Sequence, residues 1–344
     1  MWIATPAFIV FIIFIALVFD FTNGFHDSAN SISTVVSTKV LTPQKAVAFA
    51  AFFNFFSAFA FGVAVASTIS KIIQLEVVPA DLVPYIMLGA LIGAIGWNLI
   101  TWWFGLPTSS SQALIGGLTG AGIAAAGVAA IKISTLTAVI LFMIISPLIG
   151  FTLGFLFMAV VMWLTRGFAK NTAEKGFRKL QLFSAAAYSF SHGTNDAQKT
   201  MGIITPLLFS IGYYGASVDP NNLPVPFWVI LLAHTAIALG TLSGGWRIVR
   251  TMGYRITRLR PVDGFAAETA GAATIIGASA VGIPVSTTQI ICTSIMGVGT
   301  TGGAGQVRWG IARSIGWAWI LTIPISAFIG YASFSAIFAI VSMY

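Results

Sequence analysis

The chain of 344 residues is 57% hydrophobic and only 8% charged, and its mean hydropathy is +0.94. Soluble domains carry about 25% charged residues, so this composition excludes a soluble globular protein and predicts an integral membrane protein. The net charge of +8 would suggest a nucleic-acid partner in a soluble protein. Here Lys and Arg lie mostly in short loops, where they orient the chain and meet lipid headgroups, so no nucleic-acid partner is expected.

Apolar runs follow one another along the chain. Each is about 20 residues or longer, which is the length of a membrane-spanning helix rather than a barrel strand. The first run has no basic segment before it, so we interpret it as a retained helix and not a cleaved signal. We predict an all-α fold with about ten crossings, or up to about twelve helices where segments are broken or re-entrant. The predicted segments are residues 3–34, 46–70, 84–106, 107–132, 135–165, 181–209, 227–246, 263–282, 284–307 and 314–338.

Two sequence motifs each occur twice, in the same order and at similar spacing. GFHDSAN at residues 24–30 matches GTNDAQK at residues 193–199, and we call these the carboxylate motifs. PTSSSQ at residues 107–112 matches PVSTTQ at residues 284–289, and we call these the hydroxyl motifs. An apolar, Gly-rich run follows each hydroxyl motif. Together the four motifs indicate an internal repeat.

The charges of the loops indicate that the two repeats have opposite orientations. Loops rich in Lys and Arg face the cytoplasm. Residues 39–45, after the first carboxylate motif, are basic, whereas residues 213–226, after the second, contain no Lys or Arg. The next loop in each half shows the reverse, because residues 72–84 contain no Lys or Arg and residues 247–261 contain five Arg. Lys132 falls outside in this scheme and is its exception.

These observations divide the chain into two inverted-topology repeats. We predict the first repeat at residues 1–165 and the second at residues 181–344. The segment 166–180 between them holds five Lys or Arg against one Glu, so we predict a cytoplasmic basic linker there, with both termini outside. In residues 247–261 the apolar residues recur at helical spacing, which predicts an interfacial helix.

Inverted repeats are a recurrent architecture of secondary transporters, whose sites are built from discontinuous helices near the bilayer midplane. The free N–H groups and the positive dipole end of a half-helix suit an anion. Pro107 and Pro284 fit the first position of such a helix, and the hydroxyl motifs would offer donors to a tetrahedral oxyanion. Alternatively, these hydroxyls only fill tight helix contacts. The candidate substrate-binding residues are Asn30, Ser109, Ser110, Ser111, Gln112, Lys199, Ser286, Thr287, Thr288 and Gln289.

Asp27 and Asp196 are costly charges within the membrane, which makes them functional candidates. Two carboxylates beside an anion are reasonable if they hold a cation, carry a proton, or accept hydrogen bonds from a protonated substrate such as phosphate. His26 either shares a proton with Asp27 or only packs between helices. Lys199 either supplies positive charge to the anion or only neutralises Asp196. We expect His26, Asp27, Asn195 and Asp196 to serve cation or proton coupling.

The remaining polar residues of the apolar runs carry weaker expectations. His192 and His234 are interpreted as hydrogen-bonded packing residues. Glu268 is expected to interact with the Arg-rich segment or to take part in coupling, with a structural role favoured. Cys292 is the single cysteine of the chain, so neither a disulfide nor a Cys-based metal site is expected within it.

Five segments resemble the inorganic phosphate transporter (PiT) family, and the match runs through nearly the whole chain. They are NGFHDSAN at 23–30, GLPTSSSQALIGG at 105–117, FSHGTNDAQKTMGI at 190–203, GGWRIVRTMGYRITRLRPVDGFAAET at 244–269 and GIPVSTTQ at 282–289. The resemblance implies a cation-coupled symporter of inorganic phosphate with inverted repeats, in a homodimer. It also implies a substrate site formed by both motif pairs.

The chain departs from the family at four positions. Gln112 and Gln289 stand where many relatives have His. His26 and Lys199 stand where many sodium-coupled relatives have Asn, which reduces the neutral oxygens available to sodium. We therefore favour protons as the coupling ion, with sodium at Asp27 and Asp196 as the alternative. No cofactor is expected beyond the coupling cation.

The resulting hypothesis is a symporter of the cytoplasmic membrane that imports phosphate by alternating access. A sulfate or other oxyanion permease on the same scaffold is the nearest alternative. An anion channel belongs to a different class and would need a continuous polar path, whereas the polar residues cluster at one depth in each repeat. An enzyme is disfavoured because no nucleophile–base pair or metal-ligand set stands outside the four motifs.

Overall fold

The computed structural model describes residues 5–59, 62–215 and 217–343. Within them the chain forms twelve α-helices, short 3₁₀ and π segments, and an isolated β-bridge between Ile73 and Ile131. In chain order the helices are α1 (Pro6–Ser37), α2 (Pro43–Phe56), η1 (Ser57–Phe59), α3 (Ala64–Ser70), α4 (Val83–Phe104), α5 (Ser110–Ala126), η2 (Val128–Ala130), α6 (Ile133–Leu164), α7 (Lys170–Ser210), α8 (Phe227–Ser243), α9 (Trp246–Arg250), η3 (Thr251–Arg255, a π-helix), α10 (Pro261–Ala280), α11 (Thr287–Thr300), η4 (Ala304–Gln306) and α12 (Trp309–Val341). An almost purely helical chain is what a bilayer demands, because helices satisfy their backbone hydrogen bonds internally.

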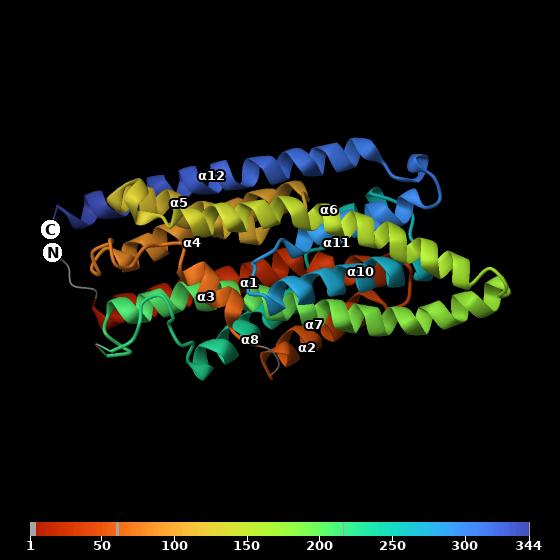
Figure 1. The fold of residues 1–344 in the computed structure, drawn as a ribbon, viewed down its shortest axis with the longest axis horizontal. Helices are drawn as coiled ribbons and strands as arrows, with labels where there is room; N and C mark the ends of the chain where they lie inside the picture. Colours follow the sequence, from red (N-terminus) through yellow and green to blue (C-terminus); the bar gives the residue numbers. More distant parts are fainter. Residues whose placement is uncertain (1–4, 60–61, 216, 344) are drawn as a thin grey trace.

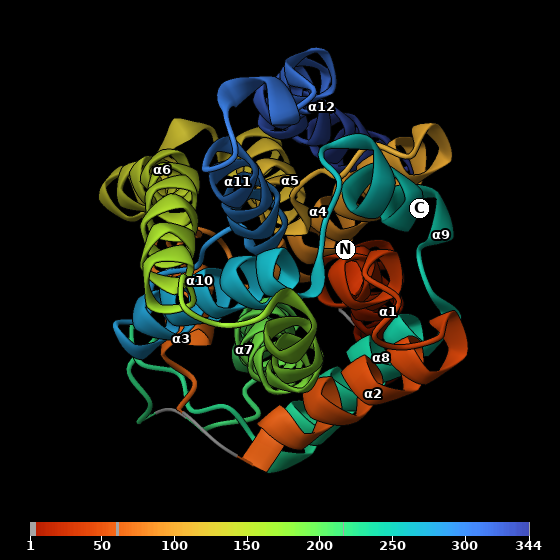
Figure 2. The same ribbon diagram turned by 90° about the vertical axis from the view of Figure 1, so that its right-hand side faces the viewer.

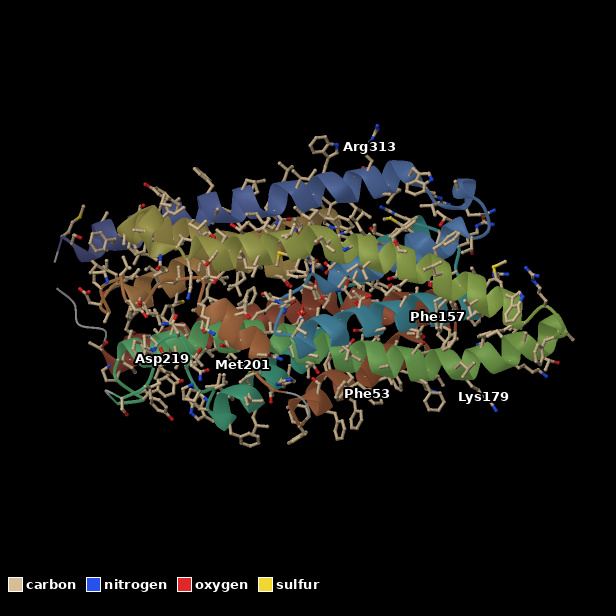
Figure 3. The ribbon with its side chains drawn as sticks, in the orientation of Figure 1. Phe53, Phe157, Lys179, Met201, Asp219 and Arg313 are labelled. Carbon is tan, nitrogen blue, oxygen red and sulfur yellow. The ribbon has the colours of Figure 1, made fainter. Side chains whose placement is uncertain are left out.

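The helices lie along one long axis, and both termini are at the same end (Figure 1). The connection from α6 to α7 is at the opposite end. Lys179 lies toward that end and Asp219 toward the end with the termini (Figure 3). The basic linker and the loop without Lys or Arg are therefore on opposite sides of the molecule.

Corresponding helices of the two halves run in opposite directions. α1, which carries the first carboxylate motif, runs away from the end with the termini, whereas α7, which carries the second, runs toward it (Figure 1). α6 and α12, which close the two halves, are opposed in the same way. These directions agree with inverted repeats, and the division at residues 1–165 and 181–344 stays a prediction.

The expectation of a multi-pass helical membrane protein with broken helices is confirmed. In the described part of the chain, α1, α4, α6 and α12 are long and apolar enough to cross a membrane alone. Two bent pairs raise the number to six: α2 with η1 and α3, and α8 with α9 and η3, the latter bent by 59°. α5, α7, α10 and α11 do not meet this criterion, so the number of about ten crossings stays a prediction.

The two halves are interleaved rather than side by side. α5 packs against α4 of its own half and α12 of the other half (Figure 2). Likewise, α11 packs against α10 of its own half and α6 of the other half. α1, α2, α7 and α8 form a third group. Small residues allow the close approach. A Cβ at Gly120 of α5 would lie 1.9 Å from the carbonyl oxygen of Ala327 in α12, and one at Gly297 of α11 would lie 2.1 Å from that of Phe151 in α6.

Three predicted segments differ from the structure. Most of the linker 166–180 is helical, since α7 begins at Lys170 and continues to Ser210 without a break. The run 46–70 is divided into α2, η1 and α3; residues 60 and 61 lie outside the described part. The segment 247–261 is not one interfacial helix, because helical structure ends at Arg255.

The apolar residues of 247–261 explain the last difference. Ile248, Met252 and Ile256 are buried in the core of the protein and not turned to lipid. The helical periodicity therefore correctly indicated a buried face, but this face packs against the rest of the protein and not against lipid. The five arginines of this segment are all exposed.

Candidate functional site

The hydroxyl motifs start two half-helices in the middle of the molecule. α5 and α11 begin there and run in opposite directions (Figure 1). Ser109 and Ser286 are their N-caps, and each side-chain hydroxyl accepts a hydrogen bond of 3.2 Å from the backbone N–H of the Gln three residues later. The prediction that a proline occupies the first helical position was wrong. Pro107 precedes the N-cap by two residues, because the serine can accept a hydrogen bond from the first turn and proline cannot.

The carboxylate motifs lie within the long helices α1 and α7, facing these helix starts. Asp27 accepts a hydrogen bond of 3.0 Å at its Oδ2 from the hydroxyl of Ser110. Its Oδ1 lies 2.6 Å from Nδ1 of His26. Asp196 pairs through Oδ2 with Nζ of Lys199 at 2.7 Å, one helical turn away. All five side chains are buried, so both carboxylates have partners in a site closed to solvent.

Hydrogen bonds from one half to the other hold this site together. Asn30 donates from Nδ2 to the hydroxyl of Thr288 at 2.9 Å. Ser111 donates to the backbone carbonyl of Val285 at 2.9 Å, and Nζ of Lys199 lies 3.5 Å from the hydroxyl of Ser110. Each of these three bonds joins a residue before position 166 to one after position 180. These bonds bring residues of both motif pairs together, and a substrate site formed by them stays a prediction.

The second hydroxyl motif is placed like the first. Thr287 donates to Oδ1 of Asp196 at 3.5 Å, which parallels the bond from Ser110 to Asp27. Tyr188 donates from its hydroxyl to the backbone carbonyl of Thr287 at 3.0 Å and holds the start of α11 against α7. The two half-helix starts thus approach two carboxylates in matching ways.

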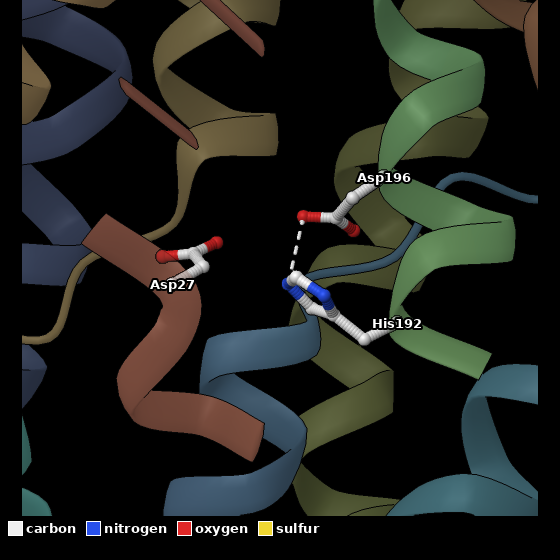
Figure 4. A group of neighbouring side chains, drawn as sticks. All are labelled: Asp27, His192 and Asp196. Carbon is white, nitrogen blue, oxygen red and sulfur yellow. Dashed lines mark ion pairs between the residues drawn. The ribbon is translucent and has the colours of Figure 1, made fainter. Parts of the chain in front are cut away.

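His192 is a site residue that the sequence interpretation missed. Its Nε2 lies 3.5 Å from Oδ2 of Asp196, and its Nδ1 lies 3.3 Å from Oδ1 of Asn54 in α2. Asp27, His192 and Asp196 each offer one ligand atom, and these three atoms lie within 4.8 Å of one another (Figure 4). The helical spacing of four residues between His192 and Asp196 was the signal that could have revealed it.

A second contact that the sequence interpretation missed is made by His26, the neighbour of Asp27. Nε2 of His26 lies 3.2 Å from the hydroxyl of Thr101 in α4 and 3.4 Å from that of Thr108, which itself donates to Thr101 at 2.8 Å. His26 is therefore held between Asp27 and two hydroxyl groups. It is a buried, hydrogen-bonded group of the site and not only a packing residue.

Other predicted residues lie near the site without joining its contacts. Asn195 donates to the hydroxyl of Ser279 in α10 at 2.9 Å, away from the carboxylates. Gln112 and Gln289 are buried, and the side-chain oxygen of each makes no hydrogen bond to another described residue. Gln198, which lies in the second carboxylate motif, accepts from the backbone N–H groups that start α3 and not from a group beside Asp196.

Glu268 does not contact the Arg-rich segment, which corrects one of its two predicted roles. It is buried in α10 and accepts hydrogen bonds from Gln181 at 3.1 Å and from the hydroxyl of Ser184, both in α7. The acidic partner of the arginine segment is Asp263, which pairs with Arg260 at 3.0 Å. Asp263 was not singled out in the sequence.

The arrangement can bind an oxyanion and a cation at adjacent positions. The starts of α5 and α11 supply orphan backbone N–H groups and a positive dipole end, and the hydroxyl motifs supply further donors. Lys199 adds a cationic group, while Asp27, His192 and Asp196 can ligate a cation or move a proton. In the described part of the chain these residues form one continuous buried cluster.

Comparisons with known proteins agree with this geometry. Residues 23–330 match the phosphate transporter family. The chain is 50% identical over 328 residues to a probable low-affinity inorganic phosphate transporter of Rhizobium meliloti (strain 1021), which covers 95% of this chain and 96% of the relative. It is 44% identical over 321 residues to the protein described in the same words from Bacillus subtilis (strain 168), covering 93% and 94%. A solved structure, the sodium-dependent phosphate transporter, matches 97% of this chain and 100% of its own with a TM-score of 0.87 at 25% identity.

Proposed function

Because the chain belongs to the phosphate transporter family, we propose that it imports inorganic phosphate by symport with a cation, through alternating access. One observation supports this most. The starts of α5 and α11 meet in the middle of the molecule, and their hydroxyls contact the carboxylates of α1 and α7. Helix starts suit an anion, and buried carboxylates within a membrane suit a cation or a proton.

The two carboxylates favour phosphate over sulfate as the substrate. Near neutral pH phosphate still carries hydroxyl protons, so it can donate hydrogen bonds to Asp27 or Asp196. Sulfate has no proton to donate, and a carboxylate facing it would repel it. A sulfate permease on the same scaffold is the alternative, and it would have to neutralise both carboxylates first.

Protons are the favoured coupling ion at this site. Lys199 is paired with Asp196 at 2.7 Å, so we assign Asp196 as the fixed charge. Asp27 contacts His26, which can exchange a proton with it, and accepts a hydrogen bond from Ser110, so we assign Asp27 as the carboxylate that gains and loses the coupling proton. The solved relative is described as sodium-dependent, and the cluster of Asp27, His192 and Asp196 supports sodium as the alternative.

We also propose how the transporter lies in the membrane. The end with Lys179 would face the cytoplasm, because basic loops are retained inside. Both termini, at the opposite end, would then be outside. α6 and α12 expose many large apolar side chains, such as Leu148 and Phe328, which suits contact with lipid or with a second copy in a homodimer.

The test is phosphate transport into proteoliposomes. The parent protein should accumulate phosphate when a proton gradient is imposed. Asp27→Asn should lose this accumulation but keep exchange of phosphate across the membrane, because the amide keeps the volume of the side chain and cannot release a proton. Asp219→Asn, which changes an exposed carboxylate outside the site, should behave like the parent.

Three results would contradict parts of the proposal. Accumulation by Asp27→Asn on a proton gradient would exclude that residue as the proton carrier. Uptake by the parent on a sodium gradient alone would exclude protons as the coupling ion. Phosphate flux that never exceeds equilibrium under any gradient, with no counterflow, would indicate an anion channel.

A further inference from the structure

A second buried polar cluster lies next to the substrate site. It consists of Asp20 and Asn23 in α1, Asn98 in α4 and Thr200 in α7, and each is at most 1% exposed. Both side-chain oxygens of Asp20, both polar atoms of Asn23 and Asn98, and the hydroxyl of Thr200 have no hydrogen-bond partner at ordinary distance and angle, although Asn23 and Thr200 lie close enough to the Asp20 carboxylate to interact with it. Buried polar groups are nearly always paired, so such a concentration of unpaired groups needs a physical explanation.

Helix register places the fourth side chain, Asn98, next to Asn23. Asn23 and Thr200 are immediate polar neighbours of the Asp20 carboxylate, and the charges of Asp196 and Lys199 also act on it. α1 and α4 both run away from the end with the termini (Figure 1). Because His26 contacts Thr101 at 3.2 Å, the residues three positions earlier in both helices lie one turn back on the same faces.

Those earlier residues are Asn23 and Asn98. α7 runs the opposite way, so Thr200, four positions after Asp196, also lies one turn toward the end with the termini. The cluster is therefore a polar layer one to two helical turns from the carboxylates of the substrate site. Lys199 is already paired with Asp196 at 2.7 Å and does not neutralise Asp20.

The atoms of this layer specify the kind of ligand. They include five oxygens: two from the carboxylate, one from each amide and one from the hydroxyl. Oxygen donors suit hard cations. The layer carries a single formal negative charge, which one monovalent cation would neutralise, whereas a divalent cation would leave a net charge buried. A proton on Asp20 would let its carboxyl group pair with Asn23 and Thr200 but would leave Asn98 unpaired.

We propose that Asp20, Asn23, Asn98 and Thr200 form a binding site for a sodium ion, distinct from the substrate site. His26 and Lys199 remove neutral oxygens from the substrate layer, and this second layer supplies them at a different depth. The proposal goes beyond the proposed function and does not make sodium the coupling ion, which stays the proton assigned to Asp27. Sodium binding itself requires no transport.

The direct test measures binding of radioactive sodium to the purified full-length protein in the absence of phosphate. Choline chloride keeps the ionic strength constant, and potassium serves as the competing cation. The parent should bind sodium saturably and prefer it to potassium. Asp20→Asn should weaken sodium binding by about a hundredfold or more, because it removes the only charged ligand of a buried site.

Two further variants keep the test informative if Asp20→Asn does not fold. Asn98→Ala and Thr200→Val each remove one neutral oxygen ligand and should weaken sodium binding about tenfold. Asp219→Asn removes an exposed carboxylate and is the matched control, so it should bind sodium like the parent. The thermal unfolding temperature of the parent should also rise with sodium concentration, since a ligand of the native state stabilises it.

The results separate this proposal from its alternatives. Unchanged sodium binding by Asp20→Asn or by both neutral-ligand variants would overturn it. Loss of sodium binding in Asp27→Asn, with binding kept in Asp20→Asn, would also overturn it and place sodium at the substrate layer. A parent protein that binds sodium at Asp20 but transports no phosphate would refute the proposed function and leave this site standing.

Discussion

Replacing Asp196 by Asn tests whether the ion pair with Lys199 is part of the site's structure. The two charged atoms are 2.7 Å apart, and both side chains are fully buried. Asp196→Asn keeps the shape of the side chain but leaves the ammonium group without its partner. The hydroxyl of Ser110, 3.5 Å away, is a neutral contact and cannot compensate the charge.

The expected cost is large because the stranded charge stays out of water. Breaking a buried pair by removing one partner costs about 3–5 kcal/mol. The entropy of unfolding is about 2.1 cal/mol/K per residue, which over 344 residues amounts to about 0.7 kcal/mol/K. The midpoint of thermal unfolding should therefore fall by about 4–7 °C.

The assay is thermal unfolding in detergent combined with phosphate transport in proteoliposomes. Asp196→Asn should impair both net uptake and counterflow. The double variant Asp196→Asn with Lys199→Met removes both charges, so its unfolding midpoint should recover much of the loss, while transport stays defective. A change in midpoint below about 1 °C in Asp196→Asn would refute the reasoning. So would a double variant that loses the sum of both single losses, because the two charges would then be energetically independent.

Three further predictions concern the substrate and the packing of the half-helices. Ser110→Ala and Thr287→Ala should each weaken phosphate binding by about 1.5–3 kcal/mol, since each removes a donor to a charged ligand; direct binding equal to that of the parent would place the site elsewhere. Arsenate should compete well with phosphate uptake and sulfate poorly, and equal competition would contradict a substrate that donates hydrogen bonds to the carboxylates. Gly120→Ala should destabilise the protein by more than about 1 kcal/mol, because its Cβ would lie 1.9 Å from a carbonyl oxygen of α12. Gly316→Ala is the control and should not destabilise the protein, because a Cβ there would have no atom within 4 Å. Equal unfolding midpoints for the two variants would show that α12 moves freely.

The repeat and the start of each half-helix could be predicted from sequence because they depend on local chemistry. Two matched motifs placed both starts to within two residues, although each helix begins at a serine that accepts a hydrogen bond from the N–H three residues later and not at the predicted proline. The pairing of Asp196 with Lys199 followed equally from helical spacing. In both cases the partners lie within one turn of each other in the sequence.

Contacts between distant helices could not be predicted in this way. Nothing local indicates that Thr101 faces His26, or that Gln198 turns to α3 and not to Asp196. The polarity of Asp20 is visible in the sequence, but its burial beside Asn23 and Thr200 is a property of packed helices. The buried apolar face of residues 247–261 was likewise read as facing lipid, since periodicity does not identify the partner of a face.

The interleaving of the halves limits how the transporter can move. α5 is packed with α4 and α12, and α11 with α10 and α6, whereas α5 and α11 do not pack along their lengths. Each half-helix start therefore belongs to a different packed group that contains helices of both sequence halves. Alternating access cannot be a separation of residues 1–165 from residues 181–344, because that would pull α5 from α12 against close glycine contacts.

A movement between the two packed groups disturbs far fewer contacts. It would shift the start of α5 relative to the start of α11 and break the bond from Ser111 to Val285, one of the bonds that join the two starts. An anion held between both starts would replace such bonds and favour the arrangement in which they are close, since a ligand shifts an equilibrium only through its differential affinity for the two states. Under the proposed mechanism, phosphate binding and closure of the site would be one event, with Asp27 and Asp196 placed on α1 and α7 between the two packed groups.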